Sequence, residues 1–350
     1  MKLGMPINYA GDFRETIDHL ADFERAGVGR VTVPEAYSFD AVSQLGYIAA
    51  RTEKMELQTG ILPMFSRTPT NLAITAAGLD YISGGRAILG IGASGPQVIE
   101  GFHGVPYNAP LGRAREHVEI CRKVWRREPV TFDGKHYHLP LGPEHGGSGL
   151  GKALKIINHP VRDRIPMLLA AIGPKNTELA AELFEEFQPF LFHPGYVDAA
   201  FGEALEAGKA KRSPDLPPLR IVVNAAALIT DDAEQIEHAN QLVRNHCALY
   251  IGGMGARGKN FYNSLAVRYG FVDEAKLIQD LYLDGKKAEA AAAVPQDLVD
   301  STALIGPRSQ VAERVEAFRA AGVGVLLAAP AAGTHAERVE DMEILRELIG

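Results

Sequence analysis

Three apolar runs of the sequence each end in a glycine-containing stretch, where the backbone carries few side chains. The three stretches read "QTGILPM", "GIGASGPQ" and "AAIGPKN". Glycine omits the side chain where a backbone must come close to a ligand. In the third stretch, the amides that open a helix at Lys175 and Asn176 form a ready anion site. We therefore predict a cofactor phosphate beside Gly173, while a plain strand-to-helix turn explains that stretch when it is taken alone.

Two side chains near the ends of apolar runs are candidates for proton transfer. Glu35 follows the second run, where apolar surroundings would favour a protonated carboxyl that donates to a substrate. The alternative is that Glu35 caps the following loop or pairs with a basic residue. His193, in "FLFHPG", is the second candidate proton donor, although an isolated loop histidine is more often structural.

The elements that must position these residues alternate between strands and helices. Eight apolar runs serve as strand candidates: Leu3–Ile7, Val31–Pro34, Met55–Leu62, Ala87–Ile91, Ile165–Ala171, Phe187–Phe192, Ile221–Ile229 and Val323–Ala328. Strands that alternate with helices pair in parallel with both faces covered. Eight such units close into a (β/α)8 TIM barrel, whose chemistry gathers at the carboxyl ends of the strands.

Capping residues mark several of the intervening helices. Asp12, Asp40 and the pair Asp231–Asp232 each precede an amphipathic segment, which predicts a helix N-terminus at each place. The sequence "SGGR" from Ser83 to Arg86 predicts a helix end and a turn into the next strand, because glycine accepts left-handed backbone geometry.

Two stretches do not fit the alternation. Val130–His159, before the fifth strand, contains "FDGKHYHL", which predicts a hairpin with Asp133-Gly134 as its turn. His136 and His138 should face one side of that hairpin, but no third ligand is apparent, so no metal site is expected. Gly252–Ser301 is too long for a connection and predicts inserted helices after the seventh strand. Neither insertion resembles an independent domain, and residues 1–350 are expected to form a single barrel.

Composition restricts the class of partner. Apolar residues make up 46% and charged residues 23% of the chain, as in an ordinary globular protein, and no segment has the apolar length of a membrane span. The start lacks a signal peptide, and Cys121 and Cys247 form no metal or redox spacing, so a cytoplasmic protein is expected. A net charge of −7 without a basic stripe argues against nucleic acid. The expected partner is a small molecule.

Longer motifs resemble a known family. The stretches "LGYIAARTEKMELQTGILPMFSRTP", "DYISGGRAILGIGAS" and "AAIGPKNTELAAE" resemble the bacterial luciferase-like monooxygenase superfamily of flavin and deazaflavin barrel enzymes. "GASGPQVIEGFHGVPY" and "REHVEICRKVWRREPVTFDGKHYHLP" look most like the branch that uses the deazaflavin coenzyme F-420. The resemblance covers most of the chain and implies a (β/α)8 barrel with a cofactor at its mouth.

The resemblance also assigns residues to that cofactor. It implies a non-prolyl cis peptide near Gly60-Ile61, against the central ring. It places the ring edge and ribityl chain on Gly92, Ala93, Ser94, Gly95 and Gln97, and the phosphate on Gly173, Pro174, Lys175 and Asn176. Relatives often carry an acid-histidine pair after the second strand, whereas this chain has Glu35 without the histidine, which leaves histidine acid catalysis there in doubt.

We therefore expect an oxidoreductase that transfers a hydride between coenzyme F-420 and an unidentified organic substrate. The alternatives are a luciferase-like monooxygenase that uses flavin mononucleotide (FMN), and a flavin-binding protein without turnover. A metal-dependent barrel hydrolase is disfavoured, because no His and Asp cluster occupies successive strand ends. The anionic tail of F-420 should meet Arg67, Lys175 or Arg115. A homodimer is expected through the helix Thr68–Ile82, whose apolar face alternatively only covers the barrel.

Overall fold

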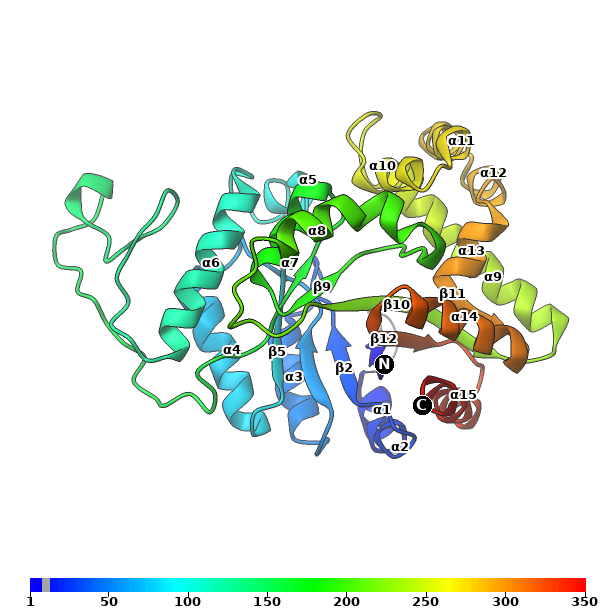
Figure 1. The fold of residues 1–350 in the computed structure, drawn as a ribbon, viewed down its shortest axis with the longest axis horizontal. Helices are drawn as coiled ribbons and strands as arrows, with labels where there is room; N and C mark the ends of the chain where they lie inside the picture. The colour runs from blue at the N-terminus through cyan, green and yellow to red at the C-terminus, as the bar shows by residue number, and fades with distance from the viewer. Residues whose placement is uncertain (8–12) are drawn as a thin grey trace.

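A closed barrel of parallel strands forms the centre of the computed structural model, which describes residues 1–7 and 13–350 (Figure 1). Eight strands of the described chain close the barrel: β1 (Lys2–Pro6), β2 (Arg30–Val33), β3 (Glu56–Thr59), β5 (Ala87–Gly92), β8 (Met167–Ala170), β9 (Glu186–Gln188), β10 (Arg220–Ile229) and β12 (Val323–Pro330). Each strand pairs with the next in this order, and β12 pairs with β1. The predicted (β/α)8 barrel is confirmed.

The barrel interior is filled in layers. A small apolar cluster, separate from the larger core beneath the helices, joins Ile88, Leu168, Val222, Val325 and Leu327. At the amino-terminal end of the strands the filling is charged, because Arg30 donates to both carboxylate oxygens of Glu186 at 2.6 and 2.9 Å. The interior is therefore a packed core, and only the opposite rim is available for binding.

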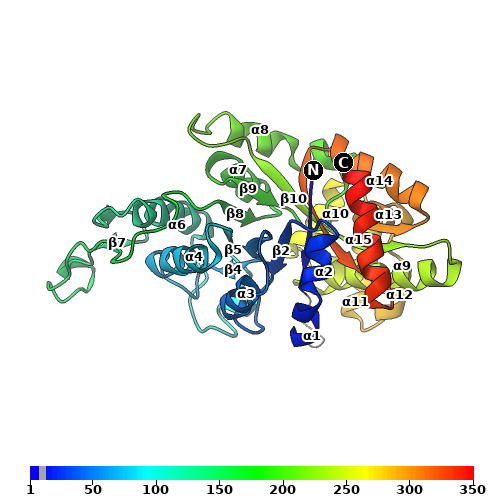
Figure 2. The same ribbon diagram turned by 90° about the horizontal axis from the view of Figure 1, so that it is seen from below.

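Helices cover the outside of the barrel. Their bounds are α1 (Phe13–Asp18), α2 (Leu20–Arg25), α3 (Ala41–Ala49), α4 (Pro69–Ser83), α5 (Pro96–Ile99), α6 (Pro110–Trp125), α7 (Pro174–Leu183), η2 (Pro194–Tyr196), η3 (Asp198–Gly202), α8 (Glu203–Lys209), α14 (Arg308–Ala320) and α15 (His335–Ile349). Figure 2 shows α15 beside α2, with both chain ends nearby. None of the helices in the described residues has the length and apolar character that a membrane span requires.

The helix ends follow the local chemistry of the sequence. The Asp40 carboxylate accepts from the Ser43 N–H at the start of α3. The Asp232 carboxylate accepts from the N–H groups of Glu234 and Gln235 at the start of α9 (Ala233–Ala248). Gly84 ends α4 with a φ of 66°, as its left-handed turn requires. Asp12 lies outside the described residues.

The insertion before the fifth barrel strand forms an arm that extends away from the barrel (Figure 1). It contains β6 (Phe132–Asp133), β7 (His138–Leu139) and the 3-10 helix η1 (Pro143–His145). The predicted hairpin is present, but Asp133 pairs with His138 inside the strands, so Asp133-Gly134 is not the turn. The turn is Gly134–Tyr137, because the Glu116 carboxylate accepts the N–H groups of Lys135, His136 and Tyr137 and stabilises this longer loop.

The insertion after the seventh barrel strand is helical, as predicted. It follows the barrel helix α9 (Ala233–Ala248) and comprises η4 (Leu249–Gly253), α10 (Phe261–Arg268), α11 (Val272–Leu283), α12 (Lys287–Ala292) and α13 (Gln296–Thr302). A strand that was not predicted follows, β11 (Ala303–Gly306), which pairs in parallel with the last residues of β10 from Ala226 to Ile229. This pairing holds the helical insertion against one side of the barrel rim.

Candidate functional site

The bare segments predicted to hold a cofactor lie at the carboxyl ends of neighbouring strands. The short strand β4 (Leu62–Pro63) pairs with β5, and β5 pairs with β8. Gly92–Gln97 begins at the last residue of β5, and Gly173–Asn176 begins two residues beyond the end of β8. Because these strands are parallel neighbours, all three segments lie along one stretch of the barrel rim. The structure therefore brings the predicted cofactor residues together.

The rim begins at a break in the third strand. The predicted strand Met55–Leu62 is divided into β3 and β4, and the break falls on Gly60 and Ile61. The cis peptide expected at this break is absent: Leu139–Pro140 is the cis bond among the described residues, and Gly60–Ile61 is trans. At the break, the Gly60 N–H donates to the Val33 carbonyl at 2.7 Å.

Only some of the rim glycines leave room for a ligand. A Cβ atom on Gly60 would lie 2.7 Å from the Pro34 Cα, and one on Gly92 would lie 2.5 Å from the Ile61 Cγ2. Packing between neighbouring strands therefore explains glycine at these two positions. A Cβ on Gly95 or Gly173 would have no atom within 4 Å. Open space at the rim thus lies beside Gly95 and Gly173, where the sequence predicted the ribityl chain and the phosphate.

The N-terminus of α7 has the properties of an anion site. Gly173 is the N-cap and carries no capping side chain, and its φ of −77° and ψ of 150° are ordinary for any residue. The amides of Lys175 and Asn176 lie in the first turn, where a helix has no partner for its N–H groups. The positive end of the helix dipole adds to their attraction for a phosphate.

Arg268, a cationic side chain that was not predicted as part of the site, lies beside the N-terminus of α7. Arg268, at the end of α10, donates from Nη2 to the Ile172 carbonyl at 2.7 Å, one residue before Gly173. Its Nε is buried and has no hydrogen-bond partner. Burial lowers the pKa of Arg268 from its usual value. No local motif marks this arginine, because 96 residues separate it from Ile172 and only the helical insertion brings the two together.

The three cations predicted to meet an anionic cofactor tail differ in availability. Arg67 and Arg115 are each paired with a carboxylate, Glu35 and Glu182 respectively, through two hydrogen bonds. Lys175 is 80% exposed and contacts Glu178 only at 3.4 Å. Of the three, Lys175 is therefore the one free to meet a ligand, and Arg67 and Arg115 are committed to ion pairs.

Glu35 occupies a structured position at the rim. Its carboxylate accepts from Arg67 at 2.6 and 2.9 Å and from the Ala41 N–H at 3.1 Å, and Arg67 also pairs with Asp40. Both oxygens of the Glu35 carboxylate are therefore already engaged in hydrogen bonds within the protein. Both parts of the alternative interpretation, capping the following loop and pairing with a basic residue, are present in the structure.

His193 lies away from Glu35, within the contact between the chain after β9 and the helical insertion. Its Nδ1 accepts from the Gly195 N–H at 3.2 Å, and its Nε2 lies 3.3 Å from Asp297 without hydrogen-bond alignment. Burial lowers the pKa of His193, and the Asp297 carboxylate partly opposes this effect. With the rings of Tyr196 and Tyr269 beside it, His193 has the contacts of a packing residue.

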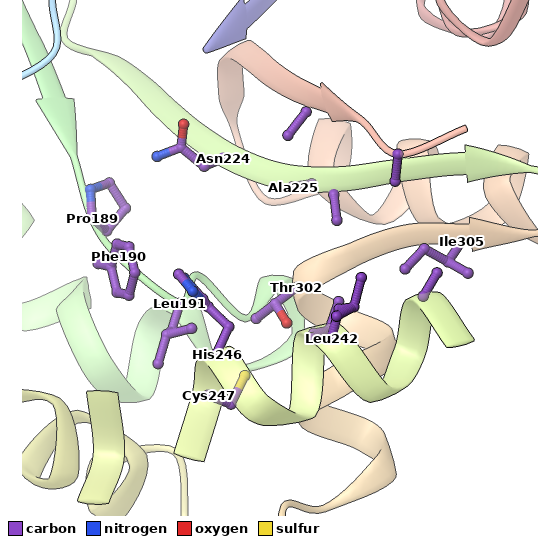
Figure 3. A pocket seen from close by; sticks show the side chains of 15 residues that line it. Pro189, Phe190, Leu191, Asn224, Ala225, Leu242, His246, Cys247, Thr302 and Ile305 are labelled. Carbon is purple, nitrogen blue, oxygen red and sulfur yellow. The ribbon is translucent and has the colours of Figure 1, made fainter. Parts of the chain in front are cut away.

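A cavity of about 270 Å³ lies beside the same rim, between the strands and α9 (Figure 3). Its walls are mostly apolar and include Phe190, Leu191, Ala225, Leu242 and Ile305. Figure 3 shows these side chains facing one another across the space between β10 and α9. No sequence motif marks this cavity, because its walls come from separate parts of the chain: the residues after β9, β10, α9 and β11.

Polar and aromatic groups adjoin the cavity. Asn224 is exposed in the middle of β10, an unusual place for a polar side chain in a barrel strand, and Figure 3 shows its amide on the other side of β10 from α9. Phe190 packs against Tyr250 and Tyr262 with ring centroids 4.3 and 5.4 Å apart. The cavity therefore offers a largely apolar compartment to an organic molecule.

Comparisons with known proteins point to one family. The family model described as luciferase-like monooxygenase matches residues 1–324. A protein of Mycobacterium tuberculosis, provisionally named a coenzyme F-420-dependent oxidoreductase, is 39% identical over 99% of both chains. The 5,10-methylenetetrahydromethanopterin reductase of Archaeoglobus fulgidus is 26% identical, over 82% of this chain and 80% of its own length.

The fold is also found in solved structures. The coenzyme F-420-dependent tetrahydromethanopterin reductase of Methanopyrus kandleri superimposes with a TM-score of 0.78, covering 99% of this chain and 98% of its own. Sequence identity over this superposition is 20%, so this likeness concerns the fold.

Proposed function

The chain belongs to the luciferase-like monooxygenase family, and from this premise we propose that it is an oxidoreductase that transfers a hydride between coenzyme F-420 and an organic substrate. The observation that carries the proposal is the relative named as an F-420-dependent oxidoreductase, which is 39% identical over nearly the whole of both chains.

The residues at the rim fit this cofactor. Its phosphate would be held by the first-turn amides of Lys175 and Asn176, with Gly173 leaving space for the approach. Arg268 would supply positive charge through its buried, unpartnered Nε, and exposed Lys175 would meet the anionic tail. Ala93, Ser94, Gly95 and Gln97 follow β5 on the same rim and would hold the ring edge and ribityl chain.

The bound cofactor supplies or accepts the hydride, and the protein supplies position and surroundings. The apolar walls formed by Phe190, Leu191 and Ile305 exclude water and favour substrates with a hydrocarbon or aromatic part. The Glu35–Arg67–Asp40 group ties the loop after β2 to the loop after β4 and so fixes one side of the mouth. In this arrangement Glu35 orients the mouth, and proton donation by Glu35 is the competing hypothesis.

Cofactor titration tests the proposal. Purified protein is titrated with F-420 and, separately, with FMN, while the absorbance and fluorescence of each cofactor are followed. We expect saturable F-420 binding that FMN does not displace at equal concentration. Tight FMN binding that F-420 fails to compete with would identify the flavin monooxygenase alternative. F-420 binding without turnover of any carbonyl or alcohol substrate tested would favour a binding protein.

A further inference from the structure

A group of side chains on the arm has the composition of a metal site. Asp133 ends β6, His138 lies opposite it on β7, and His145 ends η1. The Nδ1 of His138 is 2.8 Å from the Asp133 Oδ1, and the His138 and His145 rings stack with centroids 3.5 Å apart. Each of the three residues offers one ligand atom, and these atoms all lie within 4.8 Å of one another.

No metal site was expected here, because His138 was grouped with His136 and no third ligand was apparent in the sequence. The structure separates these two histidines. His136 lies in the Gly134–Tyr137 turn, with its Nε2 against Gly112 of α6, whereas His138 faces the other arm residues. The missing ligands are His145, which follows a loop that no periodic pattern predicts, and Asp133, which had been assigned to the turn.

We propose that Asp133, His138 and His145 form a binding site for a divalent transition-metal ion of the Zn²⁺ class. Two imidazoles and one carboxylate are a donor set that Zn²⁺ accepts, with a fourth position for water or another carboxylate. Glu144 is placed to supply that carboxylate, since its Oε1 lies 4.0 Å from the His145 Nε2.

Small movements of exposed side chains would complete the site. Ligand atoms around tetrahedral zinc lie roughly 3.3 Å apart, given metal–ligand distances of about 2.0–2.2 Å. Stacked imidazoles direct their in-plane lone pairs side by side, so one ring must turn for both to face a single ion. The side chains of Asp133 and His145 are 93% and 39% exposed, which leaves both free to make this adjustment.

The location gives the ion a structural role. The arm has only two two-residue strands and one three-residue 3-10 helix, and Leu150 and Ile157 are exposed on it. An ion bound to both the hairpin and η1 would cross-link the two and restrict the loop between them, as metals do in segments that lack a core. The site is separate from the α7 rim and does not depend on the proposed hydride transfer.

Zinc titration of the full chain tests the site. Protein without a histidine tag is freed of metal with a chelator and titrated calorimetrically with Zn²⁺, and Co²⁺ absorption reports the coordination geometry. We expect one ion per chain, with affinity lowered at least about tenfold by His138→Ala and by His145→Ala. The matched control is His136→Ala, on the same hairpin but outside the site, which should bind as the wild type does.

Limited proteolysis gives a second readout. Zn²⁺ should slow cleavage within residues 134–150 of the wild type and of His136→Ala, and should have no effect in the double variant His138→Ala/His145→Ala. Absence of Zn²⁺ binding in the wild type would overturn the site, as would equal affinity in His138→Ala, His145→Ala and His136→Ala. Circular dichroism of each variant confirms that the barrel is folded, so that loss of binding reports the ligands.

Discussion

Single residues at the barrel rim show how their partners decide their roles. Glu35 and Arg67 form a bidentate ion pair, and the Gly173 N-cap leaves first-turn amides open beside Arg268. His193 caps η2 and packs against aromatic rings. At this scale, Gly173 is the residue that we propose lies beside the cofactor phosphate, and Glu35 is the residue whose proposed positioning role differs from its predicted catalytic role.

Replacing Gly173 by leucine should block the approach of a phosphate to α7 without unfolding the protein. The backbone angles of Gly173 suit any residue, and a Cβ there meets no atom within 4 Å. We expect F-420 affinity to fall by at least about tenfold, equivalent to about 1.4 kcal/mol. Fluorescence titration measures the affinity, and thermal unfolding confirms the fold. Gly173→Ala is the graded control and should lose less, whereas unchanged affinity in folded Gly173→Leu would remove the phosphate site.

Glu35→Gln separates the two roles of the carboxyl. If Glu35 positions the mouth, losing its charge leaves Arg67 half-paired and should lower the free energy of unfolding by about 1–3 kcal/mol. Turnover should then fall only modestly. If Glu35 donates a proton, stability should hold while turnover drops about 10²–10⁴-fold. Denaturant unfolding and single-turnover oxidation of reduced cofactor across pH are measured together. Arg67→Met is the matched control, since it removes the same ion pair from the other side.

Elements of the structure contribute chemistry that single residues do not. The helical insertion brings Arg268 to the α7 N-terminus and, with β11 and α9, forms the apolar cavity beside β10. At the carboxyl end of β10, α15 places the carboxyl of Asp341 against the strand, where it accepts from the Ile229 N–H at 3.2 Å while its other oxygen is buried without a partner. The Asp341 carboxyl is therefore buried in the contact between α15 and β10.

Asp341 should make stability depend on pH. Burial raises the pKa of Asp341 from 3.8 to about 7, with Glu340 and Glu337 adding repulsion. The folded state therefore favours the protonated acid. The stabilisation of the folded state by protonated Asp341 is fully present below pH 3.8, and it is lost as the pH rises through 7. Asp341→Asn cannot ionise, so it should gain about 2 kcal/mol relative to wild type between pH 5 and pH 8.

Urea unfolding of both proteins at several pH values measures this difference. Replacing the carboxyl oxygen by an amide group also changes the free energy of unfolding by an amount that does not depend on pH, and comparing the two proteins across pH removes this constant. Parallel stability profiles for wild type and Asp341→Asn would show that the buried carboxyl does not titrate in this range.

The whole molecule has an apolar surface that its own fold leaves uncovered. Ile74, Gly78, Tyr81 and Ile82 share one face of α4, at the spacing of successive helical turns, and all are exposed, Tyr81 by 67%. The opposite face of α4, with Leu72, Ala76 and Leu79, is buried against the barrel. The buried apolar face of α4 is therefore explained by its packing on the barrel. We propose that the exposed apolar face is the surface of a homodimer.

Dimerisation through α4 should be sensitive to charge. Light scattering coupled to gel filtration should give twice the monomer mass for the wild type at micromolar concentration. Ile74→Lys/Ile82→Glu should be monomeric, because an apolar interface does not accept unpaired charges. The control is Leu277→Lys on α11, a similarly exposed apolar residue outside this face. A monomeric wild type, or a dimer unaffected by the α4 substitutions, would contradict this interface.

The alternation of eight apolar runs with amphipathic segments determined the barrel from the sequence alone. Period and capping are local properties of the chain, and parallel pairing follows from them. The sequence also predicted that the bare segments after β5 and β8 lie on one rim, because the carboxyl ends of parallel strands share an edge. Both insertions were also evident, since each breaks the alternation over many residues.

Only the tertiary structure decided which distant groups meet. Arg67 reaches Glu35 across 32 residues of sequence, and Arg268 reaches Ile172 across 96. The pairing of β11 with β10, the proximity of His145 to Asp133, and the trans peptide at Gly60-Ile61 likewise depend on how insertions and neighbouring strands pack. Local patterns carry no information on such contacts, because side-chain partners are selected by the packing of the whole chain and not by the propensity of any one segment.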